Sequence, residues 1–231
     1  MGYGQRPVRP SESRQLTRSG KLGVRARLEF YLSKISRILP GPSVPSSDHK
    51  RAKILEIAKK FGCGTFVETG TFVGDTVAYM VPHFRSIISI ELSPRLAERA
   101  RHRFAAEPAV QILEGDSSEM LATIVPTLHE RGFFWLDGHY SHTCTVNGEK
   151  LETARGAEET PVLKELAAVL ADKSHDHVIV IDDARLFTGE GQYPTRRAIS
   201  RLARSYNRGY AIRREDDMII LAPPQAAEGQ A

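Results

Sequence analysis

The sequence predicts one α/β domain built on a doubly wound, mostly parallel sheet of seven strands that closes with an antiparallel hairpin. Short apolar segments alternate with amphipathic segments from residue 50 onward. Parallel strands need a crossover about as long as a helix, so this alternation favours parallel pairing with helices on both faces. The last two apolar segments, 210–214 and 218–221, are joined by only three residues, 215–217, and can pair only as a hairpin.

The apolar segments give the expected strands in chain order. We expect strands at residues 65–68, 86–91, 110–113, 133–136, 178–181, 210–214 and 218–221. Helical periodicity places helices between them at residues 50–61, 75–81, 94–105, 118–129, 161–171 and 195–206. Pro94 suits the first position of its helix, because its missing N–H has no partner there. This order is typical of a Rossmann-like fold.

The N-terminal 47 residues are expected to be an appendage. Residues 1–27 are rich in Arg, Ser and Gly without apolar periodicity, which predicts a disordered basic arm. Residues 28–39 repeat apolar side chains at helical spacing, and the Pro/Ser-rich stretch up to residue 47 forms a linker to the domain at 48–231. The apolar face of the 28–39 helix needs a partner: the domain, a second copy in a homo-oligomer, or a membrane surface contacted peripherally.

The charge distribution bears on possible partners. The chain has 32 basic and 28 acidic residues, but residues 1–39 hold nine of the basic and two of the acidic ones. The rest therefore carries a net charge of −3, so no specific nucleic acid partner is expected for the domain. The two cysteines are too few for a disulfide framework, and neither a signal peptide nor a membrane-spanning run is recognisable. A cytoplasmic location is expected.

Polar residues stand where the first three strands end, at the edge where open α/β sheets bind ligands. The first strand runs into Glu68-Thr69-Gly70-Thr71, whose glycine lets the backbone approach a ligand closely. Glu91 ends the second strand, where a carboxylate can accept hydrogen bonds from both ribose hydroxyls. Asp116 and Ser117 follow the third strand, placed to meet an adenine ring. Together these residues predict an adenosine pocket.

Two features distinguish among adenosine cofactors. The GxGxxG spacing of dinucleotide-binding domains is absent, which weighs against a dehydrogenase. Glu68 would also lie beside a pyrophosphate and repel it. S-adenosylmethionine instead carries an ammonium and a sulfonium group, which an acid attracts, so it is the expected cofactor.

In this order and spacing the motifs resemble those of the class I S-adenosylmethionine-dependent methyltransferases, over residues 54–223. Residues 67–71 with Gly74 resemble the first motif of that family, residues 90–91 the second and residues 115–117 the third. The resemblance implies a small-molecule acceptor and a cofactor-binding set made of Glu68, Thr69, Gly70, Thr71, Gly74, Asp75, Glu91, Asp116, Ser117 and Asp137.

A narrower resemblance concerns residues 135–140, Trp-Leu-Asp-Gly-His-Tyr, together with residues 180–183, Val-Ile-Asp-Asp. These segments are similar to those of metal-dependent sugar O-methyltransferases of the macrocin type. The resemblance implies that Asp137, Asp182 and Asp183 bind a divalent ion. His139 lies two residues past Asp137 and is expected to accept the proton, although an acid can stand at this position in the enzymes it resembles; Asp137 and His139 are the expected catalytic residues. Three converging carboxylates would repel one another, and Mg²⁺ would remove that conflict.

The residues alone leave alternatives open. Asp137 could contact the cofactor amine with no metal present, as in metal-independent N- or O-methylation, and the fold could also serve a non-catalytic S-adenosylmethionine-binding protein. The loop at 141–160 is long for a compact domain and is expected to be a lid over the acceptor. Arg185 and Tyr193 are further candidates for the pocket wall.

Overall fold

The computed structural model describes residues 44–138, 144–146, 149–151 and 160–224. The predicted arm at 1–27, the predicted helix at 28–39, the candidate base His139 and most of the predicted lid lie outside the described residues. The domain from Val44 onward belongs to one compact unit. Among the helices of the described part, none is long and apolar enough to span a membrane.

The sheet has seven strands in the order β3-β2-β1-β4-β7-β9-β8, which confirms the predicted fold. The parallel pairs join β1, β2, β3, β4 and β7, whereas β9 is antiparallel to both of its neighbours, β7 and β8. The strands are β1 (Thr65–Thr69), β2 (Ser86–Glu91), β3 (Val110–Glu114), β4 (Gly132–Leu136), β7 (Val178–Ile181), β8 (Ala211–Glu215) and β9 (Met218–Ala222).

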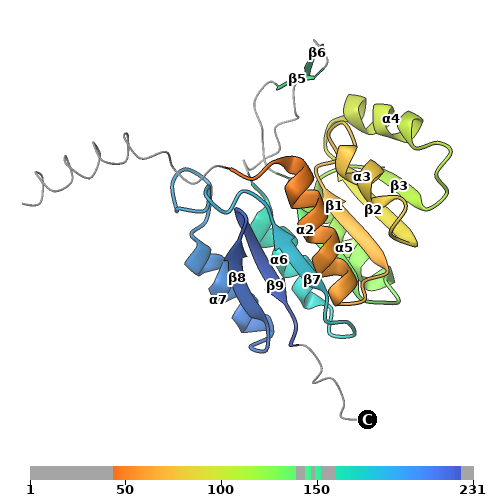
Figure 1. The fold of residues 1–231 in the computed structure, drawn as a ribbon. Coiled ribbons are helices and arrows are strands. Elements are labelled where there is room, and N and C mark those ends of the chain that lie inside the picture. Colours follow the sequence, from red (N-terminus) through yellow and green to blue (C-terminus); the bar gives the residue numbers. More distant parts are fainter. Residues whose placement is uncertain (1–43, 139–143, 147–148, 152–159, 225–231) are drawn as a thin grey trace, which may run out of the picture. The chain divides into compact units, whose positions relative to one another are not determined.

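Helices cover both faces of the sheet (Figure 1). One face packs against α2 (Ser47–Lys60), α3 (Asp75–Met80) and α4 (Pro94–Arg103). The other packs against α5 (Ser117–Ile124), the 3-10 helix η1 (Val125–Thr127), α6 (Val162–Ala171) and α7 (Arg196–Tyr206). Successive side chains of a strand point to opposite faces, so Phe66 joins the α2 side and Val67 the α5 side, and both are fully buried.

The predicted loop at 141–160 contains two short antiparallel strands, β5 (Cys144–Val146) and β6 (Glu149–Leu151), which the sequence reading missed. The signal was present in the sequence. Residues 147 and 148 are Asn-Gly, the pair that most favours a tight hairpin turn, and β-branched residues precede it.

Helix α2 begins three residues before the predicted start at residue 50. Ser46 forms the N-cap, and its hydroxyl accepts a hydrogen bond of 3.2 Å from the backbone N–H of His49. The early start places Lys50 in the first helical turn, at the carboxyl edge of the sheet.

The β8–β9 hairpin turns through Asp216 and Asp217, which both have positive φ, as a two-residue turn with right-handed strand twist requires. The turn contacts α2. His49 Nε2 lies 2.9 Å from Asp216 Oδ2, and Lys53 Nζ lies 2.9 Å from Glu215 Oε1. The turn between β8 and β9 thus holds α2 in place.

Candidate active site

The turn after β1 depends on two glycines. Gly70 has a φ of +89°, and a Cβ added there would lie 2.8 Å from the carbonyl oxygen of Asp137. Gly74 has a φ of +82°, and its added Cβ would lie 2.7 Å from the ring of Phe104. A side chain at either position would be both strained and crowded, so the backbone lies close to β4 and α4 only because these residues are glycines.

Glu68 is a buried carboxyl group at the carboxyl edge of the sheet, with 2% of its surface exposed. The hydroxyl of Ser89 donates a 2.7 Å hydrogen bond to Glu68 Oε2 and lies 2.6 Å from the hydroxyl of Thr71. Burial raises the pKa of Glu68 to about 8, and repulsion from Asp137 and Glu91 adds to the rise. Among the described residues its hydrogen-bond partners are hydroxyl groups, so a cationic ligand would supply the charge compensation that the protein does not.

Glu91 ends β2 and holds the loops on either side of it. Its Oε2 accepts a 2.8 Å hydrogen bond from the N–H of Phe72, and its Oε1 accepts one of 2.9 Å from the N–H of Ser93. Burial raises the pKa of Glu91, and these backbone N–H groups oppose the rise. Each carboxylate oxygen has a second lone pair. The pair of oxygens is therefore held in position and still able to accept from a vicinal diol such as ribose.

Asp116 and Ser117, which the sequence predicts to lie beside adenine, are the N-cap and the first residue of α5. Asp116 caps the helix by accepting a 2.9 Å hydrogen bond from the N–H of Ser118. The hydroxyl of Ser117 donates a 2.5 Å hydrogen bond to Glu165 of α6. The cap fixes the backbone of this loop, and Glu165 fixes the Ser117 side chain.

Glu165 is a further candidate residue of this edge that the sequence did not predict. Its side chain is 1% exposed and makes hydrogen bonds with Ser117 and Thr69. Burial raises its pKa to about 7 against the effect of those two hydroxyl groups. A usable signal existed, because Glu165 falls between Val162 and Leu166 on the apolar face of its helix, where a lone acid needs a polar partner.

Asp137 follows β4 and is tied to the end of β1. Its N–H lies 3.2 Å from both the carbonyl oxygen and the hydroxyl oxygen of Thr69. A cavity of about 300 Å³ opens beside it. The charged lining of this cavity comes from α2 and from the ends of β4 and β7, and consists of Lys50, Arg51, Asp137, Asp182 and Asp183.

Lys50 is the buried cation of this cavity, with 6% of its surface exposed. Its ammonium group hydrogen-bonds Asp182 Oδ1 and lies 3.2 Å from Asp183 Oδ1. Burial lowers the pKa of Lys50, but the two carboxylates more than offset this and raise it overall. Burial, with repulsion from Asp137 and Asp183, raises the pKa of Asp182 to about 7 against the opposing effect of Lys50.

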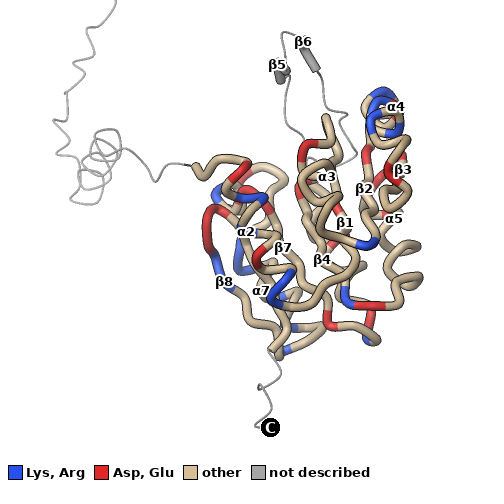
Figure 2. Tube along the Cα trace, turned by 45° about the vertical axis from the view of Figure 1, so that its right-hand side comes forward, with Lys and Arg blue, Asp and Glu red and all other residues tan. Residues whose placement is uncertain are grey.

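The remaining predicted residues lie at other places. Helix α4 is rich in arginine (Figure 2), and its Arg103 lies 2.8 Å from the exposed carboxylate of Asp75, a predicted cofactor residue. Arg185 contacts Asp183 at 2.6 Å and also pairs with Asp217, so it braces the loop after β7. Tyr193 packs against the ring of Phe187.

Among the described residues, one group of three places metal-ligand atoms within 4.8 Å of one another, and it is Asp172, His175 and His177 rather than the predicted trio. This group lies at the amino end of β7, away from the site. Gly132 N–H donates to His177 Nδ1 at 3.0 Å, so His177 carries its hydrogen on Nε2, 2.9 Å from Asp172. Both ring nitrogens are thus used within the protein. The assignment of a metal to Asp137, Asp182 and Asp183 stays a prediction.

No family profile and no curated protein sequence matches this chain. Solved structures do. An O-methyltransferase from Bacillus cereus in complex with SAH is 13% identical, with a TM-score of 0.52 over 84% of this chain and 89% of that one. The N-methyltransferase NodS from Bradyrhizobium japonicum in complex with S-adenosyl-L-homocysteine (SAH) is 12% identical, with a TM-score of 0.51 over 79% and 90%.

A third solved structure, the SAH-bound methyltransferase PaMTH1 from Podospora anserina, is 13% identical, with a TM-score of 0.50 over 91% of this chain and 100% of that one. None of the three is described as a macrocin-type enzyme, so that narrower resemblance stays a prediction. At such low identity the likeness concerns the fold. This chain has the fold of the class I S-adenosylmethionine-dependent methyltransferases.

Proposed function

We propose that this chain transfers a methyl group from S-adenosylmethionine to a hydroxyl group of a sugar or another small molecule. The observation that carries the proposal is the buried Glu68, whose pKa burial raises to about 8 and whose hydrogen-bond partners among the described residues are hydroxyl groups. Asp137 and Glu91 stand near it and add negative potential. A cofactor with an ammonium and a sulfonium group supplies the missing positive charge, whereas a dinucleotide would bring two further negative charges.

The other residues of the edge suit the remaining parts of this cofactor. Glu91 offers two fixed acceptors for the ribose hydroxyls, and the loop at Asp116 and Ser117 offers polar atoms for the adenine. Three solved proteins of the same fold have SAH in their structures, which supports a related ligand here.

The cavity beside Asp137 is the proposed acceptor site. The acceptor oxygen attacks the methyl group on the sulfonium of S-adenosylmethionine in one displacement. The carbon–sulfur bond breaks as the carbon–oxygen bond forms, so the sulfur becomes a neutral thioether, and the hydroxyl group releases its proton. The protein must hold the acceptor oxygen in line with that bond and accept the proton. Asp137 lines the cavity and is the proposed acid–base residue there, with His139 as the other candidate from the sequence.

The sequence resemblance implies an Mg²⁺ ion held by the acids at the ends of β4 and β7. Asp137, Asp182 and Asp183 are carboxylates at neighbouring strand ends, and oxygen ligands are what Mg²⁺ prefers. The ammonium group of Lys50, however, already hydrogen-bonds one oxygen atom of Asp182 and one of Asp183, so a cation stands between these two carboxylates. In this arrangement the donor set does not fit a divalent ion, so we favour metal-independent methyl transfer.

Calorimetric titration of the full-length protein with S-adenosylmethionine tests the proposal, followed by transfer of labelled methyl groups to a panel of sugars, glycosides and phenols. We expect saturable binding of one equivalent, a large loss of affinity in Glu91→Ala, and label on an acceptor oxygen. Binding without transfer to any acceptor would favour the non-catalytic alternative, and the absence of binding would reject both.

A further inference from the structure

We propose that the ammonium group of Lys50, and not a divalent metal ion, is the resident cation of the acceptor cavity. The proposal about charge stands on the geometry of Lys50 alone, whereas its consequence for the acceptor rests on the function proposed above.

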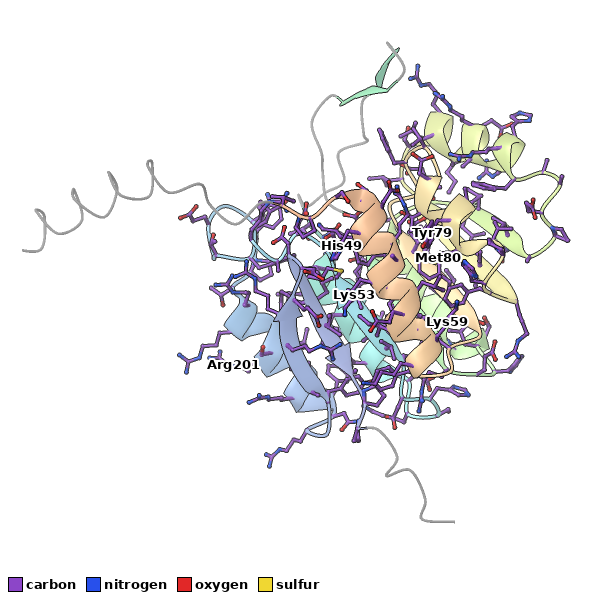
Figure 3. The ribbon with its side chains drawn as sticks, viewed as in Figure 1. His49, Lys53, Lys59, Tyr79, Met80 and Arg201 are labelled. Carbon is purple, nitrogen blue, oxygen red and sulfur yellow. The ribbon has the colours of Figure 1, made fainter. Side chains whose placement is uncertain are left out.

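The position of Lys50 is fixed by the helix that carries it. Ser46 caps the N-terminal end of α2. The apolar side of α2 packs against the sheet through Ile54, Ile57 and Ala58. The first turn, which carries Lys50, is therefore fixed by the cap before it and by the packed turns after it. Figure 3 shows His49, Lys53 and Lys59 along the same helix. Lys53 lies one turn beyond Lys50, and its more exposed side chain pairs with Glu215 and Glu56 outside the cavity.

The oxygen atoms that Lys50 contacts already have further partners. Asp182 Oδ1 also accepts a 2.7 Å hydrogen bond from the N–H of Asp183. Asp183 Oδ1 also lies 2.6 Å from the guanidinium group of Arg185. A divalent ion bound at about 2.1 Å from these oxygens would lie beside the ammonium group and repel it. The two cations exclude one another from this position.

Formal charges in the cavity agree with a lysine in this role. Three carboxylates and two cationic side chains, Lys50 and Arg51, line it, which leaves a net charge of −1. Arg185 adds a further cation 2.6 Å from Asp183 Oδ1. The carboxylates of the cavity are therefore already compensated in large part by side chains of the protein.

Lys50 also has a hydrogen-bond donor to spare. An ammonium group has three N–H donors, and two of them point to Asp182 and Asp183. Within the described part of the chain only these two acceptors contact the ammonium group, which leaves the third N–H for an oxygen atom of a ligand. We infer that the acceptor is a neutral or anionic hydroxyl compound whose oxygen accepts from Lys50, since a cationic acceptor would be repelled by it.

The test is a titration with Mn²⁺ followed by electron paramagnetic resonance, a readout that needs no acceptor. Wild-type protein, Lys50→Met and the matched control Lys53→Met are compared, and circular dichroism shows that each is folded. We expect wild type and Lys53→Met to leave Mn²⁺ free at millimolar concentration. Lys50→Met should bind about one equivalent at least about tenfold more tightly than wild type, because the acids have lost their cation.

Stoichiometric Mn²⁺ binding by wild type that Asp182→Asn abolishes would overturn the proposal, and so would a folded Lys50→Met that binds no more tightly than wild type. If Lys50→Met does not fold, wild type and Asp182→Asn decide the question between them. Calorimetry with S-adenosylmethionine on the same wild-type sample tests the proposed function separately, because failure to bind the cofactor leaves the Mn²⁺ result unaffected.

Discussion

Replacing Glu68 by Gln is expected to stabilise the protein and weaken its cofactor binding. Glu68 is 2% exposed, and burial raises its pKa from the ordinary 4.5 to about 8. Because the folded-state pKa lies above the unfolded value, the stability linked to this group is complete below about pH 4.5 and is lost as the pH rises through about 8. Glutamine has the shape of the protonated acid and keeps an oxygen for Ser89 at every pH.

The size of the effect follows from the two pKa values. At pH 7.5 the unfolded chain is ionised at this position while the folded protein is mostly protonated, which lowers the free energy of unfolding by about 3–4 kcal/mol relative to Gln. At pH 5 the same comparison gives about 1 kcal/mol or less. For a domain of this size the difference at pH 7.5 corresponds to a rise in Tm of roughly 7–14 °C.

Scanning calorimetry of wild type and Glu68→Gln at both pH values measures this difference, and titration with S-adenosylmethionine measures the other half of the prediction. Loss of the carboxylate should weaken cofactor binding by roughly 10–100-fold, the range for a hydrogen bond to a charged group. Wild-type binding should also release protons, seen as a binding enthalpy that depends on the buffer. A variant that is less stable at pH 7.5, or equally stabilised at both pH values, would refute the reasoning.

Three further predictions concern the same edge of the sheet. Gly70→Ala should lower the free energy of unfolding by about 2–4 kcal/mol, because Ala is strained at positive φ and its Cβ meets the backbone of Asp137. Unfolding in urea measures this loss, and an unchanged midpoint of the urea transition would contradict it. Glu91→Gln should weaken S-adenosylmethionine binding by roughly 10–100-fold by calorimetry, and equal affinity would show that ribose is held elsewhere. Glu165→Gln should be about 3 kcal/mol more stable than wild type at pH 8.5 and within about 1 kcal/mol of it at pH 4.5, because the stability linked to Glu165 is lost as the pH rises through about 7. Thermal melts at the two pH values measure this difference in stability. A difference that does not grow with pH would argue against the prediction.

The sequence predicted the centre of the sheet well because β1, β4 and β7 are buried on both faces. Strands such as β7, Val-Ile-Val-Ile, are apolar throughout, and the polar residues that follow them mark the ligand edge. The glycines at 70 and 74 could be recognised because only glycine allows their turns. These features depend on local sequence, so a single chain displays them.

The sequence could not supply contacts between distant elements. Lys50 looks like an ordinary polar residue at the start of an amphipathic helix, and only the fold shows that it reaches Asp182, 132 positions away. The same holds for Glu165, whose partner Ser117 lies 48 positions earlier. The acids at neighbouring strand ends suggested a metal because the cation that pairs with them, Lys50, comes from a distant part of the chain. No local pattern connects that part of the chain to these acids.

The hairpin turn at residues 215–217 has a consequence for the order in which the site forms during synthesis. Asp216 lies 2.9 Å from His49 although 167 positions separate them, and Asp217 accepts hydrogen bonds from the backbone of the loop that carries Asp183. A nascent chain released from the ribosome tunnel only as far as residue 200 has every strand-end acid but not the turn that secures α2 and this loop. Contacts of such long range form late. The cavity is therefore completed only once the turn between β8 and β9 has been made, and a chain truncated before Asp217 should fold much of its parallel sheet without a finished acceptor site.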